Sequence, residues 1–196
     1  MESIIILSVR SKEGTVPLVV IDGESDGKKT KYTITEGTYR EIGCPLSGEV
    51  LEGDEAELLI RRDEERRALA KALSILTYAD NGENQLKIKL MRHGFSKSAI
   101  DETVKECVRR GYIDDLRIIE NTVLKLASEL QGKKKIAAKL TAKGFSAGTV
   151  MKTVVRLEAE GKIDFTEARR RLISEKLPPE STKEEKLKLL HRYGYI

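Results

Sequence analysis

Residues 132–146 read GKKKIAAKLTAKGFS, and the landmarks of this segment return at a fixed distance along the chain. Its leucine, its glycine and its final aromatic residue all have counterparts 50 residues earlier and 50 residues later. The three sets are Leu90, Gly94 and Phe95; Leu140, Gly144 and Phe145; and Leu190, Gly194 and Tyr195. Self-similarity at a single period of this length indicates a repeated supersecondary unit, so the sequence predicts a tandem array.

Apolar residues take helical spacing from about Asp63 onward. In the first copy this spacing predicts three helices, over residues 64–79, 83–93 and 96–110. The second copy repeats them 50 residues later, and Leu116 opens the apolar face of its first helix. A glycine follows the second helix of each copy, where a positive φ is easiest for glycine.

The third copy is shorter than the other two. It begins at Asp164 and is interrupted at Pro178-Pro179, because proline cannot continue a helix. Ser181 and Glu184 then match the pattern of a helix N-cap, with Leu187 predicted to face inward. The sequence therefore predicts only two helices in this copy.

The first 60 residues have a different character. Short runs rich in β-branched residues cover residues 4–9, 16–21 and 31–35, and Gly and Asp separate them. Such runs predict strands paired through hairpins. Residues 49–60 fit either another strand or an early helical turn.

We therefore predict a mainly α fold, made of tandem three-helix repeats with a period of 50 residues and a small β-rich N-terminal region. The predicted segments are residues 1–62, 63–112, 113–162 and 163–196, of which the last is a truncated repeat of two helices.

The charge of the chain is unevenly distributed. Residues 1–63 carry 8 Lys/Arg and 13 Asp/Glu, a net charge of −5, whereas residues 64–196 carry 28 and 19, a net charge of +9. A basic half suggests a polyanionic or acidic partner, although solvated helix faces account for it equally well.

The residue types that carry most enzyme chemistry are sparse. The chain has two histidines and two cysteines, and it contains no phosphate-binding loop, no dinucleotide fingerprint and no zinc-ligand spacing. Cys107 lies on the apolar phase of a helix, which predicts a buried thiol. We expect no catalytic site, no metal and no cofactor, and no membrane-spanning segment.

Basic residues are concentrated in the middle copy. Three lysines open its second helix, where they oppose the helix dipole, and lysines spaced by four share one face. The residues of interest are Lys133, Lys134, Lys135, Lys139 and Lys143. Their placement suggests a partner-binding face, with a solvated surface as the alternative.

The middle copy resembles the RecX family, regulators of the recombinase RecA. The resemblance rests on Gly111-Tyr112-Ile113-Asp114-Asp115, then Arg117, the segment Gly132-Lys133-Lys134-Lys135-Ile136, Leu140, and Lys143-Gly144-Phe145. It covers the chain from about residue 64 to the end, and more loosely the β-rich extension.

The resemblance implies three-helix modules that bind the RecA–DNA filament and modulate, most often inhibit, RecA ATPase, recombination and SOS-related activity. We expect a non-enzymatic, cytoplasmic, monomeric regulator whose partner is the RecA nucleoprotein filament. Its expected partner-binding residues are the five lysines above and Arg117, which would meet either phosphates of single- or double-stranded DNA or acidic groups of RecA. The rival interpretation is a stand-alone DNA-binding protein that places helix-turn-helix-like units in a groove.

Overall fold

The computed structural model describes residues 3–196, which form two compact units. The first unit comprises the chain up to Thr77 together with Lys89–Cys107, and the second comprises Tyr78–Ile88 and Val108–Ile196. A mainly helical fold with a small N-terminal antiparallel sheet confirms the predicted fold class. The four predicted segments stay a prediction.

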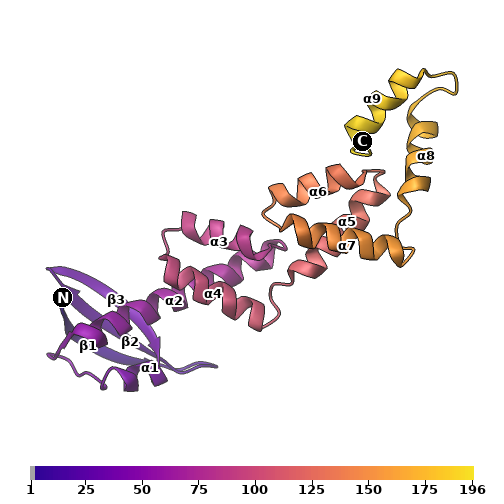
Figure 1. Cartoon of the computed structure of the whole chain (residues 1–196). Helices are drawn as coiled ribbons and strands as arrows, with labels where there is room; N and C mark the ends of the chain where they lie inside the picture. Colours follow the sequence, from indigo (N-terminus) through magenta and orange to yellow (C-terminus); the bar gives the residue numbers. More distant parts are fainter. Residues whose placement is uncertain (1–2) are drawn as a thin grey trace. The chain divides into compact units, whose positions relative to one another are not determined.

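An antiparallel sheet of order β3-β2-β1-β4 opens the first unit (Figure 1). Its strands are β1 (Ser3–Lys12), β2 (Leu18–Ser25), β3 (Lys28–Thr35) and β4 (Val50–Glu52). Asp26 and Gly27, with φ of 49° and 72°, form the two-residue turn between β2 and β3, as expected for a tight hairpin. The three predicted strands are confirmed; β1 and β3 extend beyond the predicted bounds, whereas β2 begins two residues later and ends four residues later than predicted.

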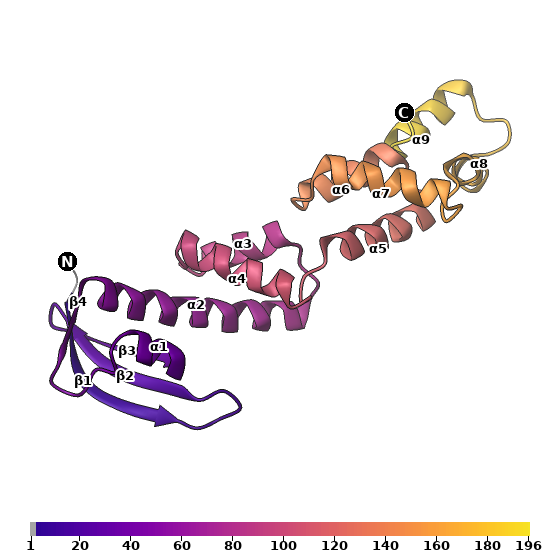
Figure 2. The same ribbon diagram turned by 60° about the horizontal axis from the view of Figure 1, so that its bottom comes forward.

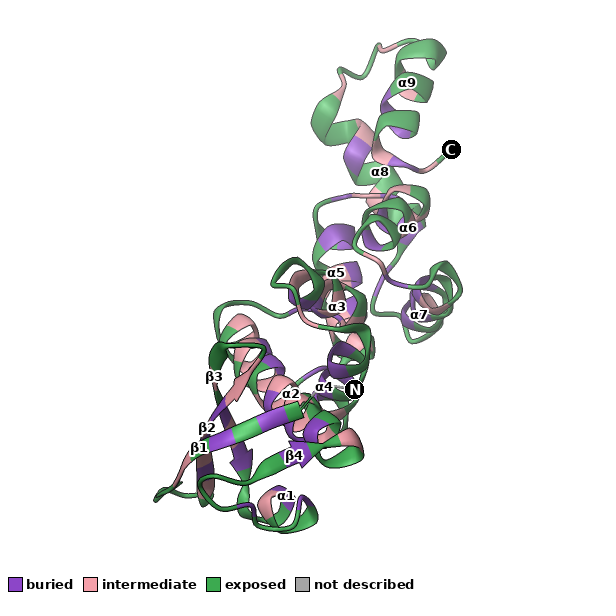
Figure 3. Ribbon diagram, turned by 90° about the vertical axis from the view of Figure 1, so that its left-hand side faces the viewer, coloured by how far each residue is buried: buried purple, intermediate pink, exposed green. Residues whose placement is uncertain are grey.

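One face of the sheet is buried, as the period-2 pattern requires. Along β1, Ile4 and Ile6 are buried whereas Ile5 and Leu7 are exposed, and Figure 3 shows the alternation along the strand. Helix α1 (Glu36–Glu41) follows β3, and the start of α2 (Gly53–Tyr78) contributes Ala56 and Leu59 to the same core.

Helix α2 is one continuous helix from Gly53, so the predicted start near residue 64 is wrong (Figure 2). Residues 49–60 therefore contain both β4 and the first turns of α2. Buried residues of α2 lie first at Ala56 and Leu59, then at Ala68 and Ala72. Leu59 and Ala68 are separated by about 180° around the helix at 100° per residue, so no single apolar stripe marks the helix.

Buried Asp63 ties α2 to the sheet. Its carboxylate accepts a hydrogen bond from Thr33 N at 2.8 Å and one from Arg67 Nε at 2.7 Å. These partners compensate the burial of a charge that would otherwise be costly. The predicted segment boundary after residue 62 therefore falls inside an element that also belongs to the β core.

Helices α3 (Glu83–Arg92) and α4 (Lys97–Arg109) agree with the predicted second and third helices within two residues. Glu64 of α2 accepts hydrogen bonds from the backbone and the hydroxyl of Ser96, which precedes α4, at 2.7 and 2.6 Å. Ile100 and Cys107 are buried on α4, as the spacing predicts.

The second unit contains five complete helices in the described chain (Figure 1): α5 (Asp115–Ser128), α6 (Lys133–Ala142), α7 (Ala147–Ala159), α8 (Phe165–Lys176) and α9 (Lys183–Tyr193). The first three share a core that includes Leu140 and Phe145. A second buried cluster includes residues of α8 and α9 and consists of Leu130, Leu172, Leu189 and Leu190. The glycine after each second helix has a positive φ: 81° at Gly94, 90° at Gly144 and 81° at Gly194.

Three details of the predicted helices are wrong. Leu116 is 62% exposed and Leu187 is 45% exposed, because Ile119 and Leu189 provide the buried positions of α5 and α9. The cap of α9 is Thr182, whose hydroxyl accepts from Glu185 N, rather than Ser181. The segment 181–185 holds two overlapping S/T-x-x-E patterns, between which the sequence cannot choose.

Candidate partner-binding surface on the second unit

Helix α6 and its C-cap residue, Lys143, carry the five lysines that the sequence singles out. Ile136 and Leu140 are fully buried and fix the orientation of the helix against α5 and α7. Successive side chains of an α-helix are rotated by 100° about its axis, so the five lysines point in different directions and do not share one environment. They separate into two lysines that make intramolecular contacts and three that do not.

Lys133 and Lys135 are half-buried and bonded within the protein. The Nζ of Lys133 lies 2.6 Å from Glu158 Oε2 and 5.3 Å from the ring centroid of Phe165. The Nζ of Lys135 donates to the carbonyl of Arg192 at 2.8 Å and lies 5.4 Å from the centroid of Tyr193. Both lysines therefore help to hold neighbouring copies together.

Backbone carbonyls of the last residues satisfy the start of α6. Gly132 N donates to Tyr193 O at 2.7 Å, and Lys134 N donates to Gly194 O at 3.1 Å. These carbonyls occupy the end of the helix at which negative partial charge is favoured. The unfavourable placement of lysines at this terminus is thus offset by intramolecular contacts and does not by itself require a partner.

The other three lysines of α6 face solvent. Lys134, Lys139 and Lys143 are exposed, and none of their ammonium groups makes an ion pair with the described part of the chain. They present three mobile positive charges on a rigid helix. Such groups can meet phosphate or carboxylate groups of a partner without breaking an existing pair.

Arg117 lies in a different place, at the start of α5. Asp114 caps this helix by accepting from Arg117 N at 2.9 Å, which leaves the guanidinium group exposed. The side chain lines an open groove of about 610 Å³ between α5 and α7, together with Leu116, Thr149, Lys152 and Arg156. None of the five lysines of α6 lines this groove, so the structure does not gather the six predicted residues into one site.

Lys152 is an exposed cation that sequence reasoning missed. A comparison of positions 50 residues apart could have singled out Lys152, because the equivalent residue of the first copy is Glu102. Arg156 likewise replaces Glu106. These two positions of the third helix are therefore acidic in the first copy and basic in the second.

Arg156 is held in an ion-pair network that links α5 to the end of α7. Its guanidinium lies 2.6 Å from Glu120 and 3.0 Å from Glu160. The hydrogen bond from Arg156 is the main cause of the lowered pKa of Glu120, and the hydrogen bond from Lys162 is the main cause of the lowered pKa of Glu160. Arg156 thus has a structural role, whereas Arg117 and Lys152 keep their charge available.

Within residues 3–196, no cluster of three or more His, Cys, Asp or Glu side chains is arranged to hold a metal ion. Nor does any helix in this part of the chain combine the length and apolarity needed to cross a membrane.

Comparison with known proteins finds similarity to one family. The family model described as "RecX, first three-helix domain" matches residues 68–107, which span the second half of α2 to α4. A protein named "Regulatory protein RecX" from Listeria monocytogenes is 26% identical over 120 residues, covering 61% of this chain and 45% of that protein. A protein of the same name from Vibrio vulnificus is 28% identical over 79 residues, covering 40% and 52%.

These similarities support a relationship of the chain to the RecX family. It spans about half the length of the RecX relatives that it matches. A crystal structure of a "regulatory protein RecX" shares the fold, with a TM-score of 0.67 over 96% of this chain and 91% of that chain, at 16% identity. The tandem helical arrangement described above is therefore a RecX fold.

Proposed function

We propose that this protein is a regulator that binds a RecA–DNA filament and lowers the rates of ATP hydrolysis and strand exchange. Similarity to RecX proteins supports a regulatory role, because these relatives are named regulatory proteins. The proposal places the protein in recombinational DNA repair and the SOS response, in the cytoplasm and as a monomer.

The observation that carries the binding surface is the division among the lysines of α6. Lys134, Lys139 and Lys143 are exposed without an intramolecular partner, whereas their neighbours Lys133 and Lys135 are bonded within the unit. Arg117 and Lys152 add charge at the groove between α5 and α7. We propose that the three exposed lysines meet the filament directly, and that Lys133 and Lys135 act by positioning α6.

Variants of α6 test this proposal. The triple variant Lys134→Gln, Lys139→Gln, Lys143→Gln should remain folded, because exposed substitutions usually change stability by less than about 0.5 kcal/mol. We expect it to inhibit RecA ATPase on single-stranded DNA more weakly than wild type. The inhibition should also become less sensitive to salt, since fewer counterions or ion pairs are exchanged.

The matched control is Lys133→Gln, which removes a cation with an internal partner. It should lower thermal stability while leaving the salt dependence of ATPase inhibition close to that of wild type. If the folded triple variant inhibits as well as wild type at two salt concentrations, the three lysines are merely solvated.

The rival function is sequence-selective binding to naked duplex DNA. A helix-turn-helix unit would place its third helix, α7, in the major groove. The exposed residues of α7 include apolar Met151 and Val155, at 38% and 57% exposure, next to Lys152. This face offers fewer charges for phosphate contacts than α6, which favours the filament regulator.

A further inference from the structure

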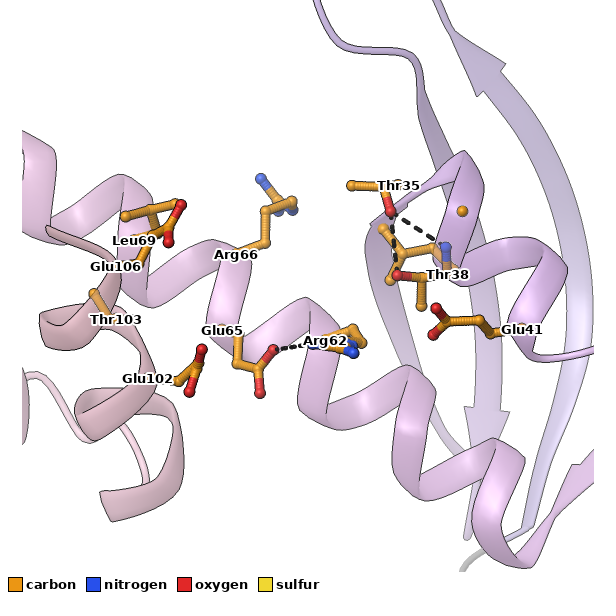
Figure 4. Close-up of a pocket in the computed structure, with 12 residues that line it drawn as sticks. Thr35, Thr38, Glu41, Arg62, Glu65, Arg66, Leu69, Glu102, Thr103 and Glu106 are labelled. Carbon is orange, nitrogen blue, oxygen red and sulfur yellow. Dashed lines mark hydrogen bonds and ion pairs between the residues drawn. The ribbon is translucent and has the colours of Figure 1, made fainter. Parts of the chain in front are cut away.

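The first unit contains an acidic groove that has no part in the function proposed above. The groove lies between the end of β3 with α1, helix α2 and helix α4, and it has a volume of about 420 Å³ (Figure 4). Four carboxylates line it, from Glu41, Glu65, Glu102 and Glu106, against two guanidinium groups, from Arg62 and Arg66. Ile34 and Leu69 supply apolar surface.

The carboxylates of this groove differ in how far they are already paired. Glu65 lies 3.1 Å from Arg62, and Figure 4 shows this contact on the α2 side of the groove. Glu41 makes no ion pair in the described chain, and Glu102 has an exposed lysine at 3.8 Å. At least two carboxylates of the groove are therefore available to a cation from outside.

Two buried polar atoms of the lining residues lack a partner. These are the Nε of Arg62 and the hydroxyl oxygen of Thr103, a residue that is only 3% exposed. Burial without a hydrogen bond is unfavourable for such groups. An incoming group that accepts and donates hydrogen bonds would satisfy them.

The equivalent position in the next copy shows that the orphaned hydroxyl is not imposed by the helix. Thr153, 50 residues after Thr103, donates to the carbonyl of Thr149 at 3.0 Å. The charges around the two threonines are also reversed, because Lys152 replaces Glu102 and Arg156 replaces Glu106. The groove of the first unit is therefore the more acidic of the two.

We propose that the acidic groove binds an extended segment of a partner protein that carries Lys or Arg. The cationic head would pair with Glu41 or Glu102, and its aliphatic stem would lie against Leu69. A backbone carbonyl would accept from Arg62 Nε. This requirement for an acceptor favours a peptide over a polyamine, which carries cations but no carbonyl group.

A titration of the full chain followed by ¹⁵N–¹H NMR tests the proposal. The probe is the capped pentapeptide Ala-Arg-Ala-Lys-Ala, with Ala-Glu-Ala-Glu-Ala as the charge-reversed probe and spermidine as the polyamine probe. We expect the basic peptide to shift the amide resonances of Arg62 and Thr103 in a saturable manner. The acidic peptide and spermidine should leave these two resonances in place at equal concentration.

Substitution tests the carboxylates. The double variant Glu41→Gln, Glu102→Gln should bind the basic peptide about tenfold more weakly, the loss expected for two partly exposed ion pairs. Lys152→Gln is the matched control, because it changes the same repeat position in the other copy, and it should bind like wild type. Circular dichroism verifies that each variant is folded.

Three outcomes would overturn the proposal. The first is equal affinity of the double variant and wild type. The second is displacement of the peptide by spermidine at equal concentration. The third is concentration-dependent self-association that the double variant abolishes, because the groove would then receive a second copy of this chain.

Discussion

At the scale of single residues, glycines set the distance between successive copies of the second unit. Gly132 has an ordinary φ of −80°, so its backbone conformation does not require glycine. Its surroundings do, because a Cβ there would lie 2.7 Å from Tyr195 N and closer still to the backbone of Gly194. The same role falls to Gly82, where a Cβ would lie 2.6 Å from the ring of Phe145.

Gly132→Ala should therefore destabilise the second unit. The added methyl group forces the backbone of residues 194–195 away from α6, and such overpacking costs about 1–3 kcal/mol. Chemical unfolding measures the loss. The matched control is Gly148→Ala on α7, where the nearest atom is 3.7 Å away, and it should be neutral or stabilising by up to about 1 kcal/mol. Equal stability of the two variants would show that the contact between Gly132 and residues 194–195 tolerates a side chain.

At the scale of elements, the predicted helices are accurate where one face stays buried along the whole helix. Helix α4 keeps Ile100, Val104 and Cys107 on one side, and the spacing alone locates it. Helix α2 changes its buried side between Leu59 and Ala68. The apolar period is lost there, so the sequence could not reveal that one helix serves both the sheet and the helical array.

The candidate site, too, could be predicted only in part from the sequence. The spacing locates the lysines of α6 on a helix, and the exposure of Lys134, Lys139 and Lys143 agrees with a surface role. The contacts of Lys133 with Glu158 and of Lys135 with Arg192 join residues 25 and 57 positions apart. Such contacts follow from tertiary packing, which no local pattern encodes.

The ion pairs between α5 and α7 should make the stability of the second unit depend on pH. The pKa of Glu120 is lowered from 4.5, chiefly by the hydrogen bond from Arg156. Because its pKa is lowered in the native state, the ionised Glu120 carboxylate stabilises that state at pH values above 4.5. This stabilisation is lost as the pH falls through the lowered pKa. Glu120→Gln should therefore be less stable than wild type at pH 7.

The difference between Glu120→Gln and wild type should shrink as the pH falls below 4.5. Urea unfolding at a series of pH values measures it. Glu13→Gln, in an exposed turn, is the control and should follow the wild-type curve at every pH. A gap between Glu120→Gln and wild type that is constant with pH would show that the substitution acts through packing instead.

At the scale of the whole molecule, the second unit is a series of copies that complete one another. The start of α3 receives its acceptor from the following copy, because Glu83 N donates to Asp115 at 3.0 Å. The start of α6 is completed by carbonyls of Tyr193 and Gly194. By contrast, the start of α9 is capped from within the same copy, by the capping box of Thr182 and Glu185.

These contacts between copies hold α6 in place while its exposed lysines remain available to a partner. This arrangement is expected of a rigid binding array. The net charge of +9 over residues 64–196 extends the basic character along the helical region. Such an array could recognise either a protein–DNA filament or DNA alone.

Co-sedimentation tests this point most directly. The wild-type chain is centrifuged with RecA and single-stranded DNA in the presence of a non-hydrolysable ATP analogue, with DNA alone, and with RecA alone. We predict that the chain pellets with the RecA–DNA filament at a saturable ratio and stays in the supernatant in the other two samples. Equal pelleting with DNA alone, or a chain that stays in the supernatant in all three samples, would contradict the filament regulator.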